Sequence, residues 1–243
     1  MSTFAPVDRR SFSAAVFEQI LAQILDGTLV PGAPLPSERT LTSELGVTRQ
    51  VVREALQRLD QLGLVEIRHG GGTRVQDYRT SAGLDLLPRL FRRADGSIDR
   101  DVVCSVMEMR QAIGADAAAL CATRLDDTSA LRAAVADLGA GTAADLDSRF
   151  WDLIVDGSQN ICYRLSLNAL RQAYHPAAAL VGHILTGEVA ARARYGSVLD
   201  AIDARDPEAA RSAAAELLAI GTAAVRAFLE RGADGLTKPM EDR

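Results

Sequence analysis

The chain has 243 residues, 48% of them hydrophobic, and is long enough to form two domains that each bury a core. Its net charge of −5 excludes a generally basic nucleic-acid-binding surface, so any contact with nucleic acid must be local. No apolar run approaches the roughly 18 residues of a membrane span, and the N-terminal MSTFAPVDRR lacks the apolar block of a signal peptide. We therefore expect a soluble, cytoplasmic protein without membrane contact.

Helical periodicity predicts three helices in the first part of the chain. The first covers residues 11–26 and carries apolar side chains at helical spacing. Ser37 is the expected N-cap of a short second helix over 38–45, and Thr48 that of a third over 49–63. Because a tight glycine turn joins the last two helices, they form a helix-turn-helix pattern, whose second helix enters the major groove of DNA.

The N-terminal end of the third helix offers side chains that read DNA. Arg49 and Arg53 lie four residues apart and share an outer face with Gln50. Guanidinium groups read guanine edges, and amides read adenine edges. For a helix taken alone, a solvated surface face is the alternative interpretation, but the segment that follows favours DNA binding.

Two short strands, LVEIR and TRVQD, follow the third helix and are joined by three glycines that begin at Gly70. They predict a hairpin whose tip carries His69 between Arg68 and Arg74. A basic hairpin directly after a helix-turn-helix is typical of a wing.

Three stretches of this first module closely resemble the winged helix-turn-helix of the GntR family of regulators. They are GTLVPGAPLPSER at 27–39, GVTRQVVREALQRL at 46–59 and GLVEIRHGGGTRV at 63–75. Many members carry a lysine between the wing glycines, where this chain has Gly71, so we expect one phosphate contact to be missing. The resemblance implies DNA contacts by Arg39, Thr48, Arg49, Gln50 and Arg53, and by His69 and Gly70 at a wing tip that enters the minor groove.

The charge of this module predicts how it binds. Residues 1–78 contain 8 Arg against 9 Asp and Glu, a net charge of −1, which is low for a DNA-binding domain. Affinity must then rest on few arginines, and a dimer doubles their number. We expect a homodimer on a palindromic double-stranded operator.

The second module is predicted to be all α-helix. The expected organisation is a winged helix-turn-helix over 1–77, a small polar linker over 78–85, an all-α bundle over 86–231 and a disordered tail over 232–243. The fold class is therefore mainly α. Helical spacing predicts bundle helices over 101–125, 127–139, 143–157, 160–185, 187–205 and 207–231, with Pro176 kinking or splitting the fourth.

The three cysteines do not form a disulfide framework or a metal site. Cys104, Cys121 and Cys162 are far apart and lie within apolar helical patterns. We expect them to be small core residues.

Three motifs in the second module resemble the FCD domain, the effector-binding and dimerisation domain of the FadR-type branch. They are EMR at 108–110, DSRFWDLIVDGSQN at 147–160 and VLDAIDARDPEAA at 198–210. Most FCD domains hold a metal with an aspartate, a histidine four residues later and two further histidines. The resemblance places Asp147 at the aspartate position and Trp151, Tyr195 and Leu217 at the three histidine positions.

We expect no metal and no other cofactor. None of Trp151, Tyr195 and Leu217 replaces an imidazole as a ligand for zinc or nickel. His175 and His183 point in directions roughly 80° apart on an ideal helix, so a surface or core role is the better interpretation of both.

Two interpretations remain for the site around the single tryptophan. In one, Trp151, Asp147 and the other two substituted positions line a wide apolar pocket, and Arg110 meets a carboxylate or phosphate of the ligand. In the other, Trp151 plugs the core and Arg110 pairs with Glu108 or a neighbouring acid. The first favours a large amphiphilic effector, and the resemblance to the metal-free FadR subgroup implies a fatty acyl-CoA or lipid. A small organic or sugar acid held by Arg110 is the alternative.

The sequence thus predicts a ligand-responsive transcription regulator, with repression the more common mode in such families. An enzyme would use acids such as Glu108, Asp147 or Asp152, but no glycine-rich phosphate loop, nucleophile motif or metal cluster accompanies them. The acidic net charge opposes a non-specific architectural DNA protein. We therefore expect no enzymatic activity.

Overall fold

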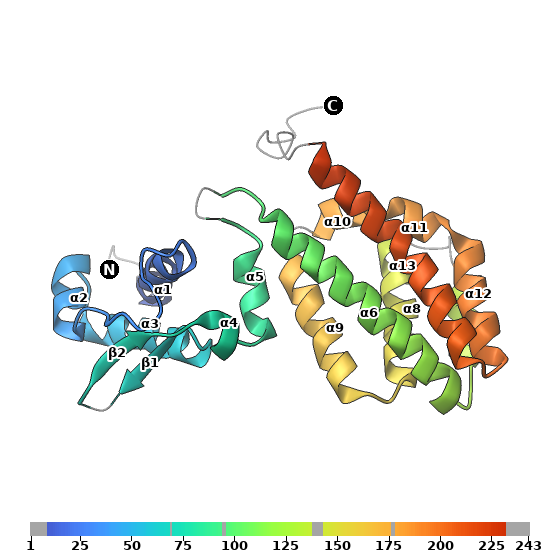
Figure 1. Ribbon diagram of the computed structural model, residues 1–243, viewed down its shortest axis with the longest axis horizontal. Coiled ribbons are helices and arrows are strands. Elements are labelled where there is room, and N and C mark those ends of the chain that lie inside the picture. Colours follow the sequence, from blue (N-terminus) through green and yellow to red (C-terminus); the bar gives the residue numbers. More distant parts are fainter. Residues whose placement is uncertain (1–8, 69, 94–95, 138–142, 176–177, 232–243) are drawn as a thin grey trace, which may run out of the picture. The chain divides into compact units, whose positions relative to one another are not determined.

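The structure is a computed structural model that describes residues 9–68, 70–93, 96–137, 143–175 and 178–231. His69 and the tail expected over 232–243 lie outside these ranges. The chain forms two compact units, Met1–Ser97 and Ile98–Arg243, and each is described by itself (Figure 1). Their secondary structure confirms the predicted mainly α fold class, a winged helix-turn-helix followed by a helical bundle.

Three helices and a two-stranded hairpin form the body of the first unit. The strands pair antiparallel, with Val65 opposite Val75 and Arg68 opposite Gly72. The apolar faces of the helices and of the hairpin share one core. The elements are, in chain order, α1 (Arg9–Leu25), α2 (Glu38–Leu45), α3 (Arg49–Gln61), β1 (Val65–Arg68) and β2 (Gly72–Val75).

Both predicted N-caps of the helix-turn-helix are confirmed. The Ser37 hydroxyl accepts the Thr40 amide at 3.1 Å, and the Thr48 hydroxyl accepts the Val51 amide at 3.4 Å. Gly46 ends α2 in the left-handed conformation, with a φ of 64°. Because these contacts satisfy amides of the first helical turns and stop α2 after eight residues, the boundaries of the motif are set locally.

The structure corrects the linker predicted over 78–85. Leu86, just beyond it, is only 1% exposed and belongs to the core of the first unit, so this region is packed against that unit. The first unit accordingly extends to Ser97. Small polar residues had suggested a free tether, but here they form short helical turns: α4 (Tyr78–Ser81), η1 (Leu84–Leu86) and α5 (Leu87–Leu90).

The second unit is an all-α bundle, as predicted. The helix expected over 160–185 is divided, because α9 ends at Tyr174 and α10 begins at Ala178, with the intervening Pro176 outside the described residues. The helix expected over 187–205 is also two helices. The bundle contains α6 (Arg100–Arg124), α7 (Ser129–Ala136), α8 (Ala143–Gly157), α9 (Ile161–Tyr174), α10 (Ala178–Ile184), α11 (Thr186–Ala190), α12 (Arg192–Asp203) and α13 (Pro207–Glu230).

The long helices α6 and α13 lie side by side through the bundle (Figure 1). Asp206 caps α13 by accepting the amides of Glu208 and Ala209 at 3.1 and 3.0 Å, with Pro207 in the first turn. Among the described residues, α13 alone is long and apolar enough to cross a membrane, although no uninterrupted apolar run in the sequence has that length. Core helices of bundles meet the same criterion, and Leu217 of α13 is fully buried in the core.

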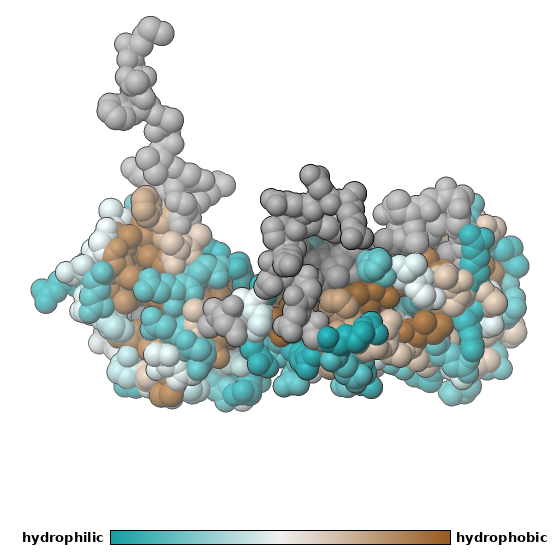
Figure 2. All heavy atoms as spheres, turned by 90° about the horizontal axis from the view of Figure 1, so that it is seen from above, coloured by the Kyte–Doolittle hydropathy of each residue, from teal (hydrophilic) through white to brown (hydrophobic). Residues whose placement is uncertain are grey.

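Of the three cysteines, only Cys121 meets the expectation of a core position. Burial raises the pKa of its thiol to about 12. Cys104 is half-buried, and Cys162 is exposed near the start of α9. The apolar pattern there was misleading because α9 also exposes Ile161 and Leu165, at 68% and 60%. Apolar and hydrophilic residues are likewise interspersed on the face seen in Figure 2.

Gly63, between α3 and β1, is expected to tolerate no side chain. Its φ is 71°, and a Cβ there would lie 2.4 Å from the backbone oxygen of Ser81. The Ser81 hydroxyl also donates to the Gly63 carbonyl at 2.6 Å. We expect Gly63→Ala to lower the free energy of unfolding by about 2–4 kcal/mol in urea, from left-handed strain and the backbone clash together.

Gly46→Ala is the matched control. Gly46 has a similar φ of 64°, but nothing lies within 4 Å of a Cβ added there. Only the conformational cost of about 1–2 kcal/mol is expected. Equal losses in the two variants would contradict a role for the Ser81 contact.

Candidate DNA-binding face and ligand site

The exposed face of α3 presents three of the predicted DNA contacts. Arg49 and Arg53 expose 73% and 61% of their side chains. Gln50 is exposed beside them, and its amide donates to Glu54 at 3.0 Å. The opposite face of α3 is buried in the core. The helix is therefore held by one side while its first turns stay open to a partner.

Glu38, which the sequence analysis did not single out, organises this face. Arg49 Nε donates to Glu38 Oε2 at 2.8 Å, and Arg53 Nε lies 3.6 Å from Oε1. Because Glu38 begins α2, the contact joins the two helices of the motif. Exposed pairs of this kind contribute only about 0–1 kcal/mol, so other anions can replace the carboxylate. In the sequence, the only indication of this role was that Glu38 is an acidic residue in the first turn of α2.

The other predicted contacts have different surroundings. Arg39 is exposed on α2. Thr48 is exposed too, but its hydroxyl already caps α3. Gly70 turns the wing with a φ of 75°, a conformation that favours glycine. His69 lies outside the described residues.

The two wing arginines are engaged with protein groups. Arg68 pairs with Glu66 at 2.8 Å, and hydrogen bonding to that carboxylate raises the pKa of the guanidinium. Arg74 Nη1 donates to the carbonyl of Gly32 at 2.9 Å. The Arg74 contact ties the wing to the loop before α2, whereas Arg68 and Glu66 both lie on β1. The α3 arginines are paired too, but their side chains are more exposed, at 73% and 61% against 56% for Arg68.

A buried ion pair lies in the bundle. Arg110 of α6 donates to both carboxylate oxygens of Glu188 in α11, at 2.5 and 3.1 Å. Its Nη2 atom is also 3.9 Å from Asp147 of α8. The Arg110 and Glu188 side chains are 12% and 0% exposed. Glu108, the partner considered from sequence, pairs instead with Arg226 at 3.0 Å on the surface.

Two of the three substituted histidine positions contact Asp147. Trp151 Nε1 and the Tyr195 hydroxyl both donate to Asp147 Oδ1, at 2.9 and 2.6 Å. The Trp151 ring packs against Gly114, where a Cβ would lie 3.2 Å from the indole. Leu217 is fully buried in the apolar core. The carboxylate that metal-binding relatives would use as a ligand is therefore an acceptor for two side chains here.

Burial and neighbouring charges have opposite effects on the pKa values of Arg110 and Glu188. Burial lowers the pKa of Arg110, but the charge and hydrogen bonds of Glu188 outweigh it, so the pKa is raised. Burial raises the pKa of Glu188, and the charge of Arg110 offsets this only in part. Burial and the charge of Asp147 raise the pKa of Tyr195. Arg110 thus stays a cation and Tyr195 a neutral donor.

A cavity of about 30 Å³ adjoins Arg110, with room for a few water molecules at most. Arg110, Asp147 and Trp151 line it, whereas Tyr195 reaches it only through Asp147 and Leu217 lies in the core. The cavity is narrower than the wide pocket expected from sequence, because the indole fills the space beside Gly114. The Arg110 guanidinium is already paired with Glu188, which is not one of the lining residues. The apolar part of the lining comprises Ile113, Val155, Leu167, Leu170 and Leu218.

The residues at the metal position of related domains do not fit a metal. No group of three or more His, Cys, Asp and Glu side chains is placed to hold one within the described part of the chain. An indole N–H and a phenol O–H point at Asp147 instead. His175 and His183 are both exposed.

A second hollow is an open groove over α6, α9 and α13. Its polar side chains satisfy one another, since Asp116 accepts the Tyr163 hydroxyl and pairs with Arg211. These two hydrogen bonds lower the pKa of Asp116. The groove therefore presents no unpaired charge from these three residues.

Two family models match the chain, one for each unit. The model for bacterial regulatory proteins of the gntR family matches residues 12–75, and the FCD domain model matches residues 105–220.

Curated relatives match over most of the chain. The chain is 41% identical over 236 residues to HTH-type transcriptional regulator Mce2R of Mycobacterium tuberculosis, covering 92% of this chain and 95% of that protein. It is 33% identical over 202 residues to the fatty acid metabolism regulator protein of Edwardsiella ictaluri, covering 75% and 82%. The solved structure of Lar, which controls expression of the Listeria monocytogenes agr system, shares the fold with a TM-score of 0.53 at 18% identity, covering 93% of this chain and 100% of that one.

The exposed arginines of α3, the hairpin after it and the helical bundle agree with these matches. The chain belongs to the GntR family of bacterial regulatory proteins, as a DNA-binding transcription regulator with an FCD ligand-binding domain and not an enzyme.

Proposed function

We propose that this regulator is a cytoplasmic homodimer that represses by binding a palindromic operator and releases it when an acidic amphiphile occupies the bundle. The observation that carries the DNA-binding half is the pair of exposed guanidinium groups on α3, held together by Glu38. Phosphate oxygens or guanine edges replace that carboxylate on binding. The second half rests on Arg110 beside an apolar-lined cavity.

Dimerisation is proposed because one DNA-binding unit carries few cations. Residues 1–78 have 8 Arg against 9 Asp and Glu, and Arg68 and Arg74 are tied to groups of the wing and its own unit. Two units on two half-sites double the number of phosphate contacts. A symmetric dimer therefore favours a palindrome.

The effector we propose is a fatty acyl-CoA or fatty acid, and no metal or other cofactor takes part. Support comes from the apolar side chains around Arg110 and from the relative named as a fatty acid metabolism regulator protein. The small size of the cavity, about 30 Å³, favours the second candidate, a small organic or sugar acid. To release the operator, either ligand must bind the dimer conformation that cannot bind DNA more tightly than the conformation that can, by about 1–3 kcal/mol.

Arg49→Ala combined with Arg53→Ala is expected to weaken binding to DNA from the protein's own upstream region by at least about 100-fold. Each guanidinium contact with a base is worth about 1–3 kcal/mol. Fluorescence anisotropy at about 150 mM salt measures the loss, since the phosphate contribution depends on salt.

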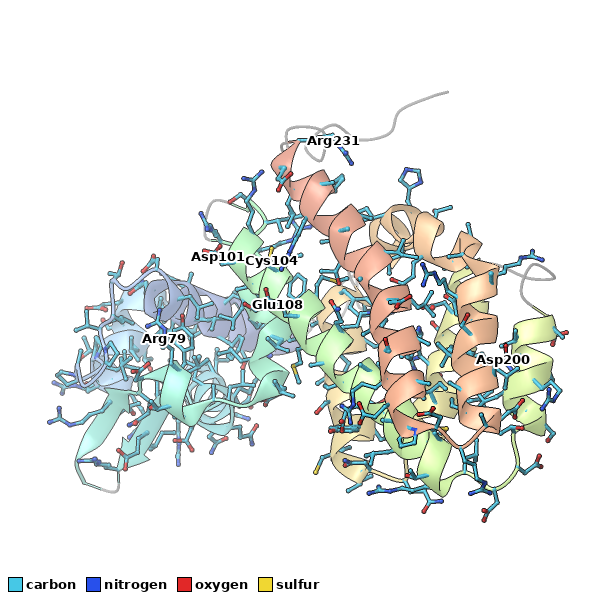
Figure 3. The ribbon with its side chains drawn as sticks, turned by 45° about the vertical axis from the view of Figure 1, so that its right-hand side comes forward. Arg79, Asp101, Cys104, Glu108, Asp200 and Arg231 are labelled. Carbon is cyan, nitrogen blue, oxygen red and sulfur yellow. The ribbon has the colours of Figure 1, made fainter. Side chains whose placement is uncertain are left out.

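Arg79→Ala is the control, because Arg79 is an exposed arginine of the same unit on α4 (Figure 3). It should change affinity less than about threefold. Unchanged affinity in the double variant would show that α3 is not the DNA-binding face. Binding of one chain per palindrome would contradict the homodimer.

Trp151→His is expected to bind no zinc or nickel. Tyr195 and Leu217 would still occupy the other two positions, leaving one imidazole and Asp147 where a zinc site needs at least three protein ligands. Elemental analysis checks this, with a variant that also carries Tyr195→His and Leu217→His as the positive control. Stoichiometric metal in the unaltered protein would overturn the metal-free proposal. Metal in the single variant would instead contradict the placing of Tyr195 and Leu217 at the other two histidine positions.

Protein purified natively and then denatured is expected to release a fatty acid or acyl-CoA. An apolar ligand that fills a desolvated site dissociates slowly enough to survive purification. Mass spectrometry of the released material identifies it. Recovery of a small organic or sugar acid alone would favour the second candidate.

A further inference from the structure

Glu188 occupies the position of an anionic ligand on Arg110. It accepts two hydrogen bonds from the Arg110 guanidinium, at 2.5 and 3.1 Å, in the bidentate geometry that a carboxylate ligand would adopt. The two residues are 78 positions apart in sequence and lie on α6 and α11. Gly221 of α13 makes room for the carboxylate, since a Cβ there would lie 2.0 Å from Glu188 Oε2.

The charges around the cavity leave no free cation among its described lining residues. Arg110 faces two carboxylates, Glu188 and Asp147. Arg171, the other cation in the lining, pairs with Asp152 at 2.7 Å. A ligand carboxylate added to this site would place a third negative charge around one buried guanidinium. Such a charge is costly in a low-dielectric interior, so one protein carboxylate must leave.

Of the two carboxylates beside Arg110, Glu188 is the better candidate to leave, although the Gly221 backbone amide also hydrogen-bonds to it. Asp147 is held by the donors of Trp151 and Tyr195 as well as by the charge of Arg110. Glu188 lies on α11, a helix of only five residues whose N-terminus has no side-chain cap. Burial raises the pKa of Glu188, so its ionised form is solvated less well here than in water and regains hydration on release.

We propose that Glu188 is an internal competitor that closes the effector site, and that the carboxylate of an amphiphilic acid displaces it from Arg110. This inference rests on the proposed function, because it requires an effector in the bundle. The released α11 carries the signal, since it packs against α8 and α13 and is separated from α12, which holds Tyr195, only by Ala191.

Trp151 reports on occupancy directly. It is the single tryptophan of the chain and lines the cavity, so ligand binding changes its fluorescence. The titrations use the full-length protein with decanoate, decanol and decanoyl-CoA. Decanol has the apolar chain without an anion, whereas decanoyl-CoA carries phosphates but no free carboxylate.

Glu188→Gln is expected to lower the Kd for decanoate at least tenfold and to leave the Kd for decanol within about twofold. The substitution removes the competing charge while keeping the shape of the side chain. Glu108→Gln is the matched control, because Glu108 is an acid of α6 that pairs with Arg226 on the surface (Figure 3). It should leave both Kd values unchanged.

Glu188→Gln leaves Arg110 without its charged partner, and this loss can destabilise the variant. Thermal unfolding with and without ligand then serves as the second measurement. Decanoate, but not decanol, should then raise the Tm of this variant more than that of the unaltered protein. Equal decanoate affinity in both proteins, with equal Tm shifts, would overturn the role of Glu188 and leave the effector site standing. A gain for decanoyl-CoA alone would overturn the carboxylate assignment. No response of either protein to any of the three compounds would overturn the lipid effector as well.

Discussion

A guanidinium buried between helices must be paired with an anion, and the bundle depends on how this requirement is met at Arg110. The group is fixed between Glu188 and Asp147, from two other helices. Breaking such a pair by removing one partner costs about 3–5 kcal/mol, because the remaining charge stays buried. Asp147 in turn accepts hydrogen bonds from Trp151 and Tyr195. One cation thus connects α6, α8, α11 and α12 around a small cavity.

At both proposed anion-binding sites an arginine is paired with a glutamate, but the two pairs differ in burial. On α3, Glu38 pairs with arginines that remain 73% and 61% exposed, so water and phosphate can replace it at little cost. In the bundle, Glu188 is fully buried against Arg110, at 0% and 12% exposure. Under the proposed function, α3 is therefore available to DNA without rearrangement, whereas an effector in the bundle first has to displace Glu188.

Features that depend on residues close together in the chain were predicted from the sequence, whereas features that depend on distant residues were not. The caps at Ser37 and Thr48 and the helices that they begin were predicted because each depends on residues within a few positions. The linker over 78–85 was mispredicted because small polar residues indicate a tether only where nothing packs against them, and Leu86 anchors this region to the first unit. Cys162 was misplaced because α9 leaves part of its apolar surface exposed.

The sequence by itself determined the helices and hairpin of the first unit up to Val75, the family and the exposed cations of α3, since helical period, glycine turns and capping residues act along a short stretch of chain. It also identified Arg110, Asp147 and Trp151 as neighbours of one site, by resemblance. Only the tertiary structure decided that Glu188 takes the guanidinium, that Trp151 and Tyr195 donate to Asp147, and that the cavity is nearly closed. Arg110 and Glu188 lie 78 positions apart in the chain, and Tyr195 and Asp147 lie 48 apart, so no local pattern encodes these two pairings. Trp151 and Asp147 are only four residues apart on α8, but the packing of the indole against Gly114 of α6 belongs to the tertiary structure.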